Sequence, residues 1–184
     1  MNEVEQTKRR PDFRKDIRYG KIAENDFMDN IAPMFRNKGY TVFDVSDIRE
    51  YQLVDIDCII DTNGYTKLLE FDTVMKDNYY KKVEVKLDSI ALTTGNIPYE
   101  TISHTNLGWS VITKCDICYM CLSERDSENI IKRAWIDMGK WTAFCKNTKT
   151  QKKLSFIKDE NIVDLLCKIK DLEKEGILKW INLK

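Results

Sequence analysis

The stretch VEVKLD, residues 83–88, alternates apolar and polar side chains along its length. Successive side chains of a β-strand point to opposite faces of a sheet, so Val83, Val85 and Leu87 would face a core. Glu84 and Lys86 would then share the other face. A carboxylate and an ammonium two residues apart on one strand indicate either a solvated sheet surface or part of a metal-dependent active site. The rest of the chain has to decide between the two.

The size and composition of the chain restrict what it can be. Its 184 residues are enough for one domain with a buried core and too few for two comfortable ones. The 30 basic and 30 acidic side chains balance, so any attraction to nucleic acid has to come from local patches. The N-terminal residues lack a secretory apolar segment, and no apolar run is long enough to span a bilayer. We therefore expect a soluble, cytoplasmic protein with no membrane partner.

The order of hydrophobic patterns predicts an α/β fold with a mixed central sheet flanked by helices. We expect residues 1–18 to form a flexible basic arm and residues 19–184 to form a single domain. A helix should begin near Tyr19 and end at Gly39, and a second helix with apolar residues at Ile162, Leu165, Leu166, Ile169 and Leu172 should close the chain. The segments predicted as extended are 40–45, 54–61, a hairpin of 65–74 with 79–88, 111–122, 130–138 and 152–159, and residues 139–147 are predicted as a short helix or turn.

Asp57 lies in the second predicted strand, where a buried carboxylate needs a partner. If that strand neighbours residues 83–88, Asp57, Glu84 and Lys86 converge on one point. Two carboxylates and a strand carbonyl are the hard oxygen ligands that Mg²⁺ prefers. A metal ion held there polarises a phosphate, and the nearby lysine can stabilise the negative charge that develops on it.

Four segments taken together resemble the PD-(D/E)XK nuclease superfamily, which has a restriction-endonuclease-like core, and particularly its small phage-encoded and Holliday-junction-resolvase-like members. The resemblance implies a Mg²⁺- or Mn²⁺-dependent endo- or exonuclease that hydrolyses phosphodiester bonds in DNA, and it allows a homodimer. The segments are YGKIAE (19–24), YQLVDID (51–57), EVK (84–86) and TTGNIPYE (93–100).

The resemblance also implies a role for individual residues. Asp57 and Glu84 match the metal ligands of the family, the backbone carbonyl of Val85 falls where a third ligand is often supplied, and Lys86 matches the catalytic lysine. Glu24 matches an acidic residue that many members place on the first helix beside the metal. An alternative is a catalytically silent member of the family that keeps the fold as a DNA-binding or assembly module.

Several positions depart from the family pattern or compete with it. Isoleucine precedes Asp57 where proline is common, and the distance along the chain from Asp57 to Glu84 is long. Glu70 with Asp72 is a rival pair at a tighter spacing, but that pair has no lysine. Glu100 is either an accessory ligand or a structural residue.

The cysteines offer a different metal chemistry. Cys115, Cys118 and Cys121 have CxxCxxC spacing, which is found in zinc and iron–sulfur sites. On a strand, however, Cys118 would point away from the other two, so we favour buried thiols over a cluster. His104 is the only histidine, and no nucleophile motif surrounds it.

Two basic patches suit nucleic acid. Residues 8–21 include seven basic side chains, Lys21 among them, against two aspartates. Residues 140–153 include Lys140, Lys146 and Lys149, no acidic residue, and the aromatic residues Trp141 and Phe144. Neutralisation of phosphates together with stacking of bases is the combination used on single strands. A lysine-rich surface over a buried Trp and Phe is the alternative.

Overall fold

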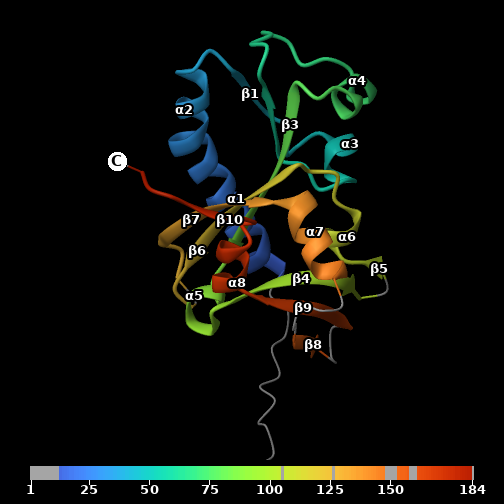
Figure 1. The fold of residues 1–184 in the computed structure, drawn as a ribbon. Helices are drawn as coiled ribbons and strands as arrows, with labels where there is room; N and C mark the ends of the chain where they lie inside the picture. The colour runs from blue at the N-terminus through green and yellow to red at the C-terminus, as the bar shows by residue number, and fades with distance from the viewer. Residues whose placement is uncertain (1–12, 105, 126, 148–152, 158–160, 184) are drawn as a thin grey trace, which may run out of the picture.

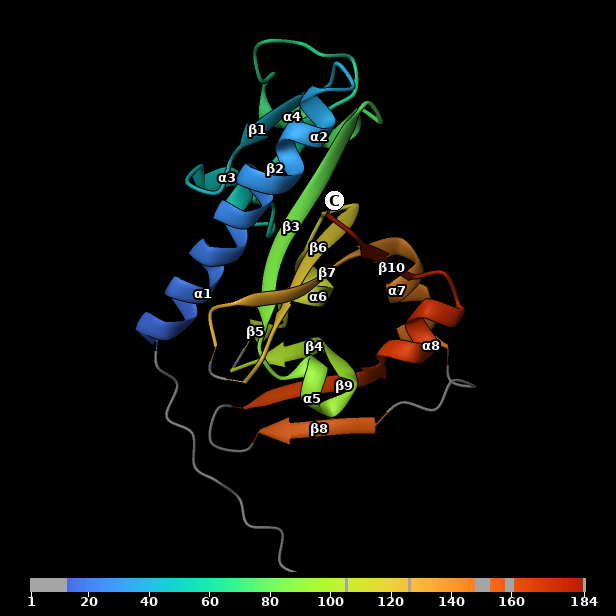
Figure 2. The same ribbon diagram turned by 90° about the vertical axis from the view of Figure 1, so that its left-hand side faces the viewer.

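The computed structural model describes residues 13–104, 106–125, 127–147, 153–157 and 161–183. It shows an α/β protein in which a mixed six-stranded sheet is flanked by helices, with a second, four-stranded sheet packed at one end (Figures 1 and 2). The first sheet has the order β1-β2-β3-β6-β7-β10, and the second has the order β5-β4-β9-β8. The strands of the first sheet are β1 (Thr41–Asp44), β2 (Cys58–Asp61), β3 (Tyr80–Asp88), β6 (Ile117–Ser123), β7 (Ile130–Asp137) and β10 (Leu178–Ile181).

The central strand β3 makes the sheet mixed. It pairs antiparallel with β2 on one side and parallel with β6 on the other. The parallel pair is possible because the intervening chain, α5 (Ala91–Thr94), β4 (Asn96–Ser103), β5 (Asn106–Leu107) and α6 (Trp109–Ile112), leaves the sheet and returns to its starting end. The mixed sheet predicted from the sequence is therefore confirmed.

One face of the six-stranded sheet is covered by the N-terminal helical segment, made of α1 (Phe13–Asp26), the π-helical turn η1 (Phe27–Ile31) and α2 (Ala32–Arg36). Figure 2 shows these elements running along one side of β3. Arg133 of β7 fixes the segment to the sheet through the Asp26 carboxylate, at 2.8 Å from Nε and 2.6 Å from Nη2. The segment ends at Gly39, which has a left-handed φ of 84°. This agrees with the prediction that Gly39 closes the helix in the C′ position.

The opposite face packs on α3 (Arg49–Gln52), α4 (Phe71–Lys76), α7 (Met138–Lys146) and the second sheet. That sheet contains β8 (Lys153–Ile157) and β9 (Ile162–Lys168), and α8 (Ile169–Lys174) leads from it to β10. The aromatic core on this side includes Trp141, which is completely buried and meets Tyr99 and Trp109 edge-on. Strands β1, β7 and β8 and helix α7 lie where the sequence predicts them.

Four predicted elements are wrong or misplaced. Residues 65–74 form a loop and the start of α4 instead of one arm of a hairpin, and β3 pairs with β2. The segment from Ile162 is a strand followed by a short helix, not one C-terminal helix. The strand expected at 111–122 begins only at Ile117, because residues 109–112 form α6. Helix α1 begins at Phe13, inside the segment predicted as a flexible arm, and residues 1–12 lie outside the described residues.

Candidate active site

Glu84 is a buried carboxylate in the middle of the central strand. Its side chain is 2% exposed, and one of its oxygens, Oε1, forms an ion pair with Lys86 Nζ. The other oxygen, Oε2, is buried without a hydrogen-bond partner. A buried carboxylate oxygen with no partner is costly, so this atom is positioned to accept a ligand.

Lys86 reaches from the same face of β3 toward solvent. Its side chain is 34% exposed, and its Nζ lies 5.1 Å from the centroid of the Trp109 ring. Attraction between the ammonium and the face of the ring holds the lysine beside Glu84. The backbone of Trp109 is anchored, because its N–H donates to Glu100 Oε1 over 3.1 Å, and its ring packs against the buried Trp141. The sequence left two roles for Glu100, an accessory ligand or a structural residue. In the structure its carboxylate contacts the backbone of α6, which is a structural role.

Asp57 lies directly before β2, one residue outside the strand predicted to contain it. Its backbone N–H donates to the Val83 carbonyl over 2.9 Å, and its Oδ2 accepts the Val85 N–H over 2.7 Å. The antiparallel ladder ends at the pair of Cys58 and Val83, and Asp57 follows it with an N–H that also points at Val83, so the regular register stops at Asp57. The charge of Asp57 raises the pKa values of both Glu84 and Lys86, so its carboxylate lies close to this pair.

The backbone of Val85 borders the same place. The ladder between β2 and β3 ends at Val83, and the Asp57 carboxylate takes the position of the next strand partner. The N–H and C=O groups of one strand residue leave the strand on the same side. The Val85 carbonyl is therefore on the same side of β3 as its N–H, which is the side bonded to Asp57.

The pKa values of these groups reflect their burial and mutual repulsion. Burial raises the pKa of Asp57 to about 6, although the Val85 N–H and Lys86 lower it. Burial also raises the pKa of Glu84, to about 8, against the lowering effect of Lys86. The charge of Asp57 raises the pKa of Glu84 further, so the two carboxylates interact electrostatically. Burial lowers the pKa of Lys86, but its pairing with Glu84 outweighs this and the net pKa is raised. A bound cation would relieve the repulsion.

Asp55 is a third carboxylate of this site that the sequence reasoning missed. Its backbone is left-handed, with φ at 49°, and its Oδ2 is buried without a hydrogen-bond partner. Burial raises its pKa, whereas the charge of Lys86 lowers it. The repeat of two aspartates at alternate positions in VDID was the signal in the sequence.

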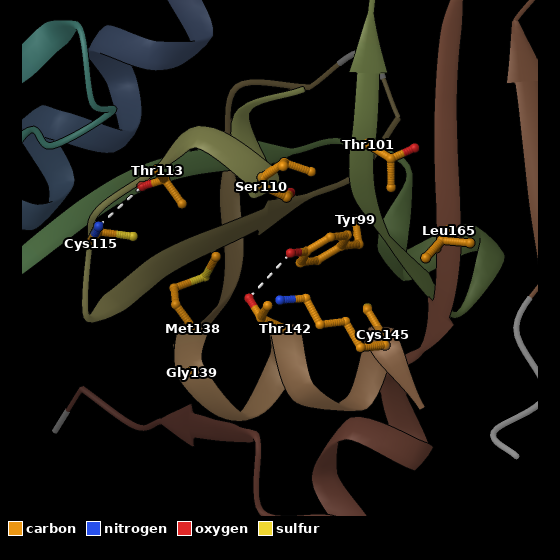
Figure 3. Close-up of a pocket in the computed structure, with 12 residues that line it drawn as sticks. Tyr99, Thr101, Ser110, Thr113, Cys115, Met138, Gly139, Thr142, Cys145 and Leu165 are labelled. Carbon is orange, nitrogen blue, oxygen red and sulfur yellow. Dashed lines mark hydrogen bonds between the residues drawn. The ribbon is translucent and has the colours of Figure 1, made fainter. Parts of the chain in front are cut away.

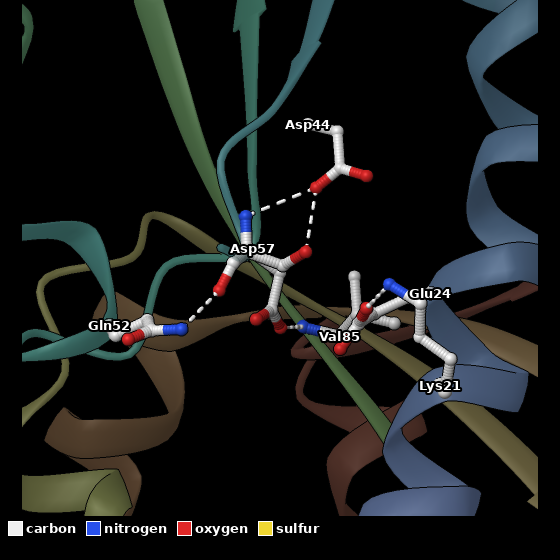
Figure 4. Close-up of polar contacts among 7 residues, drawn as sticks. Lys21, Glu24, Asp44, Gln52, Asp57 and Val85 are labelled. Carbon is white, nitrogen blue, oxygen red and sulfur yellow. Dashed lines mark hydrogen bonds and ion pairs between the residues drawn. The ribbon is translucent and has the colours of Figure 1, made fainter. Parts of the chain in front are cut away.

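Glu24 approaches from the other side of the sheet. It lies on α1, which packs on the face opposite to Glu84 and Lys86. In Figure 4, Glu24 and Lys21 extend from this helix, and Val85 lies between them and Asp57. Glu24 forms an ion pair of 2.8 Å with Lys21, and its charge raises the pKa of Asp57. The structure therefore places Glu24 near Asp57 but already engaged by a cation.

The lysines predicted to bind nucleic acid have different surroundings. Lys21 pairs with Glu24, and Lys140 Nζ lies 3.9 Å from Asp137 Oδ2. Lys146 is exposed at the end of α7, and Lys149 lies outside the described residues. Trp141 is completely buried, so the prediction that it is available for base stacking is wrong.

The competing metal sites do not assemble within the described residues. Glu70 and Asp72 are exposed at the start of α4, whereas Glu84 is buried. All six cysteines are reduced and buried, and Cys118 and Cys121 belong to the cores on opposite faces of the sheet. Among the residues that the structure describes, no three His, Cys, Asp or Glu side chains are grouped closely enough to hold a metal ion by themselves. A metal ion bound at Asp57 and Glu84 would need a carbonyl and water as further ligands.

Comparison with protein-family models, curated proteins and solved structures found no match to this chain. Within the described part of the chain, no helix has the length and apolar character needed to cross a membrane. The geometry around Glu84 is therefore the main basis for a functional proposal.

Proposed function

We propose that this protein is a metal-dependent deoxyribonuclease with a restriction-endonuclease-like core, which hydrolyses phosphodiester bonds through Asp57, Glu84 and Lys86. The observation that carries the proposal is the buried Glu84 carboxylate, with one oxygen paired to Lys86 and the other without a partner, close enough to Asp57 for the Asp57 charge to raise its pKa. Two acidic groups beside one lysine are the residue types that hydrolysis of a phosphodiester with a divalent cation requires.

The residues present fit Mg²⁺ or Mn²⁺. The donors are Glu84 Oε2, the Asp57 carboxylate and the Val85 carbonyl, all of which are hard oxygen ligands. When bound, the ion supplies charge stabilisation on a phosphate oxygen and a lower pKa for a water molecule. The raised pKa values of Asp57 and Glu84 mean that binding of the ion competes with protons, so the activity should increase between pH 6 and 8.

Lys86 has the role of stabilising charge. Its partial exposure lets the ammonium reach a phosphate in the solvent-facing part of the site, and Trp109 limits the directions it can take. There it can neutralise the charge that grows on the phosphate or orient the attacking water. Asp57 and Val85 are held together by a backbone hydrogen bond, which keeps the carboxylate beside β3 before substrate arrives.

The test is cleavage of single-stranded, duplex and branched DNA with Mg²⁺ or Mn²⁺, comparing the wild-type protein with Lys86→Met. Loss of a positioned charge-stabilising group should lower the rate constant by about 10²-fold or more. Lys132→Met is a matched control, because Lys132 Nζ lies 4.9 Å from the Trp180 ring in the same kind of contact. The control should cleave at the wild-type rate.

Metal binding without DNA separates the nuclease from a silent DNA-binding module. Mn²⁺ should raise the melting temperature of the wild-type protein at pH 8, and Asp57→Asn with Glu84→Gln should abolish that increase. DNA binding without cleavage on every substrate and with both metals would instead support the silent module. Equal cleavage by wild-type and Lys86→Met protein would refute the assignment of Lys86.

A further inference from the structure

A pocket of about 470 Å³ lies between α6, α7 and the strands β4 and β9 of the second sheet, and none of the described carboxylates lines it. Its walls come from β4, α6, α7 and β9. Figure 3 shows Tyr99, Ser110 and Thr142 among the residues that line it, with Met138 and Leu165 supplying apolar surface. The volume falls within the range of about 300–1,000 Å³ that is typical of small-molecule sites.

The lining is apolar with several hydroxyl groups. The Tyr99 hydroxyl and Thr142 Oγ1 lie 3.2 Å apart and form one hydrogen-bonded pair, and Thr101, Ser110 and Thr113 add further hydroxyls. Among the described residues that line the pocket, Lys146 carries the only charge, and it is positive. Such a pocket suits a flat, uncharged ring with hydrogen-bonding edges. The ring can be attached to an anionic group, because no carboxylate of the described lining repels a negative charge.

The pocket shares a wall with the candidate active site. Thr113 lines the pocket, and its hydroxyl donates to the Asp55 carbonyl over 3.0 Å. Cys115 also lines it, and both the charge and the backbone of Glu84 influence the pKa of the Cys115 thiol, so Cys115 lies close to Glu84. A group bound in the pocket therefore lies one residue layer from Asp55 and Glu84.

An aromatic chain leads from the pocket to the lysine of the site. The Tyr99 ring meets Trp141 at 5.2 Å, Trp141 meets Trp109 at 6.1 Å, and Lys86 lies over Trp109. These contacts connect the pocket wall at Tyr99 to the ring beside Lys86.

We propose that this pocket receives the base of an unpaired nucleotide whose neighbouring phosphate lies at Asp57, Glu84 and Lys86. The inference rests on the proposed nuclease function and extends it to a substrate class, DNA with an unpaired nucleotide. A base in an intact duplex is stacked and paired, and turning it out costs a few kcal/mol. Single strands, frayed ends and branch points do not require this cost, so they are the preferred substrates.

The binding test uses the Lys86→Met protein without divalent metal, so that cleavage plays no part. Deoxyadenosine 5′-monophosphate is titrated and compared with deoxyribose 5-phosphate, which lacks the base. We expect the nucleotide to bind at least tenfold more tightly than the sugar phosphate. Equal binding of the two compounds would overturn the proposal, because it would show that the base makes no contact.

The pocket itself is tested by filling it. Gly139 lines the pocket, and a Cβ atom there would meet only Asp137 Oδ1, at an ordinary contact distance of 3.5 Å, so Gly139→Leu adds a side chain at the pocket wall without a clash at Cβ. We expect this variant to bind the nucleotide at least tenfold more weakly, and Lys146→Gln about threefold more weakly. Lys174→Gln, an exposed lysine at the end of α8 that is not in the pocket lining, is the control and should bind normally. If Gly139→Leu does not fold, the pocket is tested with two other variants. These are Thr142→Val, which removes one lining hydroxyl, and Lys146→Gln.

The failure of this inference is distinguishable from the failure of the nuclease proposal. Nucleotide binding that is lost in Gly139→Leu supports the pocket even if no DNA is cleaved. Cleavage with a preference of at least tenfold for single strands, and loss of that preference in Gly139→Leu, supports both proposals. Cleavage of duplex and single strands at equal rates, unchanged in Gly139→Leu, overturns the pocket and leaves the nuclease intact.

Discussion

At the scale of single residues, burial gives Glu84 properties that its sequence pattern does not show. A glutamate and a lysine at alternate strand positions are common on solvated sheets, but here the carboxylate is 2% exposed and only the lysine reaches solvent. The difference arises because Glu84 lies opposite Cys118 in the parallel ladder, where the chain of β6 is buried. The same strand pattern on an edge strand would have left both side chains in water.

The burial of Glu84 leads to a prediction about stability and pH. The pKa of Glu84 is raised from 4.5 to about 8, so the folded protein holds this proton more tightly than the unfolded chain. The free energy of unfolding should therefore fall as pH rises through this interval. The pKa of Lys86 is raised above 10.5, so its contribution is constant there. Between pH 6 and 8, the free energy of unfolding should fall by roughly 2 kcal/mol less in Glu84→Gln than in the wild-type protein.

The measurement is urea unfolding at several pH values in the presence of a chelator. Asp57 titrates mainly below this interval, since its pKa is about 6. Glu128→Gln is the control, because Glu128 is 40% exposed and pairs with Arg18 on the surface. A profile for Glu84→Gln as steep as that of the wild-type protein would show that Glu84 is already ionised in the folded state.

At the scale of elements, the short helix α6 sets the position of Trp109, the aromatic partner of Lys86. Helix α6 lies close against β4, and a Cβ atom at Gly108 would lie 2.5 Å from the Glu100 carbonyl oxygen. Only glycine allows this approach, which in turn places Trp109 under Lys86. The sequence around Gly108 does not reveal this requirement, because the requirement depends on the distance between α6 and β4.

Two glycine-to-alanine substitutions should have opposite effects. Gly108→Ala should lower the free energy of unfolding by about 2 kcal/mol or more, since α6 or β4 must shift. Gly20→Ala, in the middle of α1 with nothing within 4 Å of its Cβ position, should raise it by about 0.5–1 kcal/mol. Thermal and urea unfolding of both variants is the measurement. A stable Gly108→Ala protein would contradict the close contact between α6 and β4.

The wrong elements have a common physical cause. The apolar spacing from Ile162 to Leu172 fits one helix, but Cys167 and Leu165 pair with Ile97 and Tyr99 in the second sheet, and this pairing fixes the segment as β9. Residues 65–74 have strand-like composition, yet β2 already occupies the antiparallel edge of β3, so no place remains for a hairpin arm there. Pairing between distant strands overrides local preference in both cases.

At the scale of the whole molecule, the order of the strands determines which parts should be most stable. Strand β6 has hydrogen-bonded neighbours on both sides, β3 and β7, and all but the first of its residues are buried. Strand β5 has only two residues and lies at the edge of the smaller sheet. Local unfolding should therefore begin at the edges of the second sheet.

Amide hydrogen exchange measures this ordering. Amides of Cys118 to Leu122 should exchange at least about 100-fold more slowly than those of Asn106 and Leu107, because opening β6 requires unfolding of the core. Amides of β9, which has neighbours on both sides within the smaller sheet, should lie between the two. Equal exchange in β5 and β6 would mean that the two sheets unfold as one unit.

Several features follow from the sequence alone. The period-two alternation around Glu84, the helical stripe that ends at Gly39, and strands β1, β7 and β8 are local patterns, and local backbone preference is sufficient to specify them. The candidate residues Asp57, Glu84 and Lys86 are also evident from their types and order. What only the tertiary structure decided is which of these residues meet.

The packing of the elements brought Asp57 and Asp55 close to Glu84, whereas Glu24 lies on the helix of the opposite face and pairs with Lys21. The packing of α7 against β4 and α6 buried Trp141, and the same elements form the pocket together with β9. These relations join residues far apart in the chain. They depend on the packing of whole elements, which local sequence patterns do not encode.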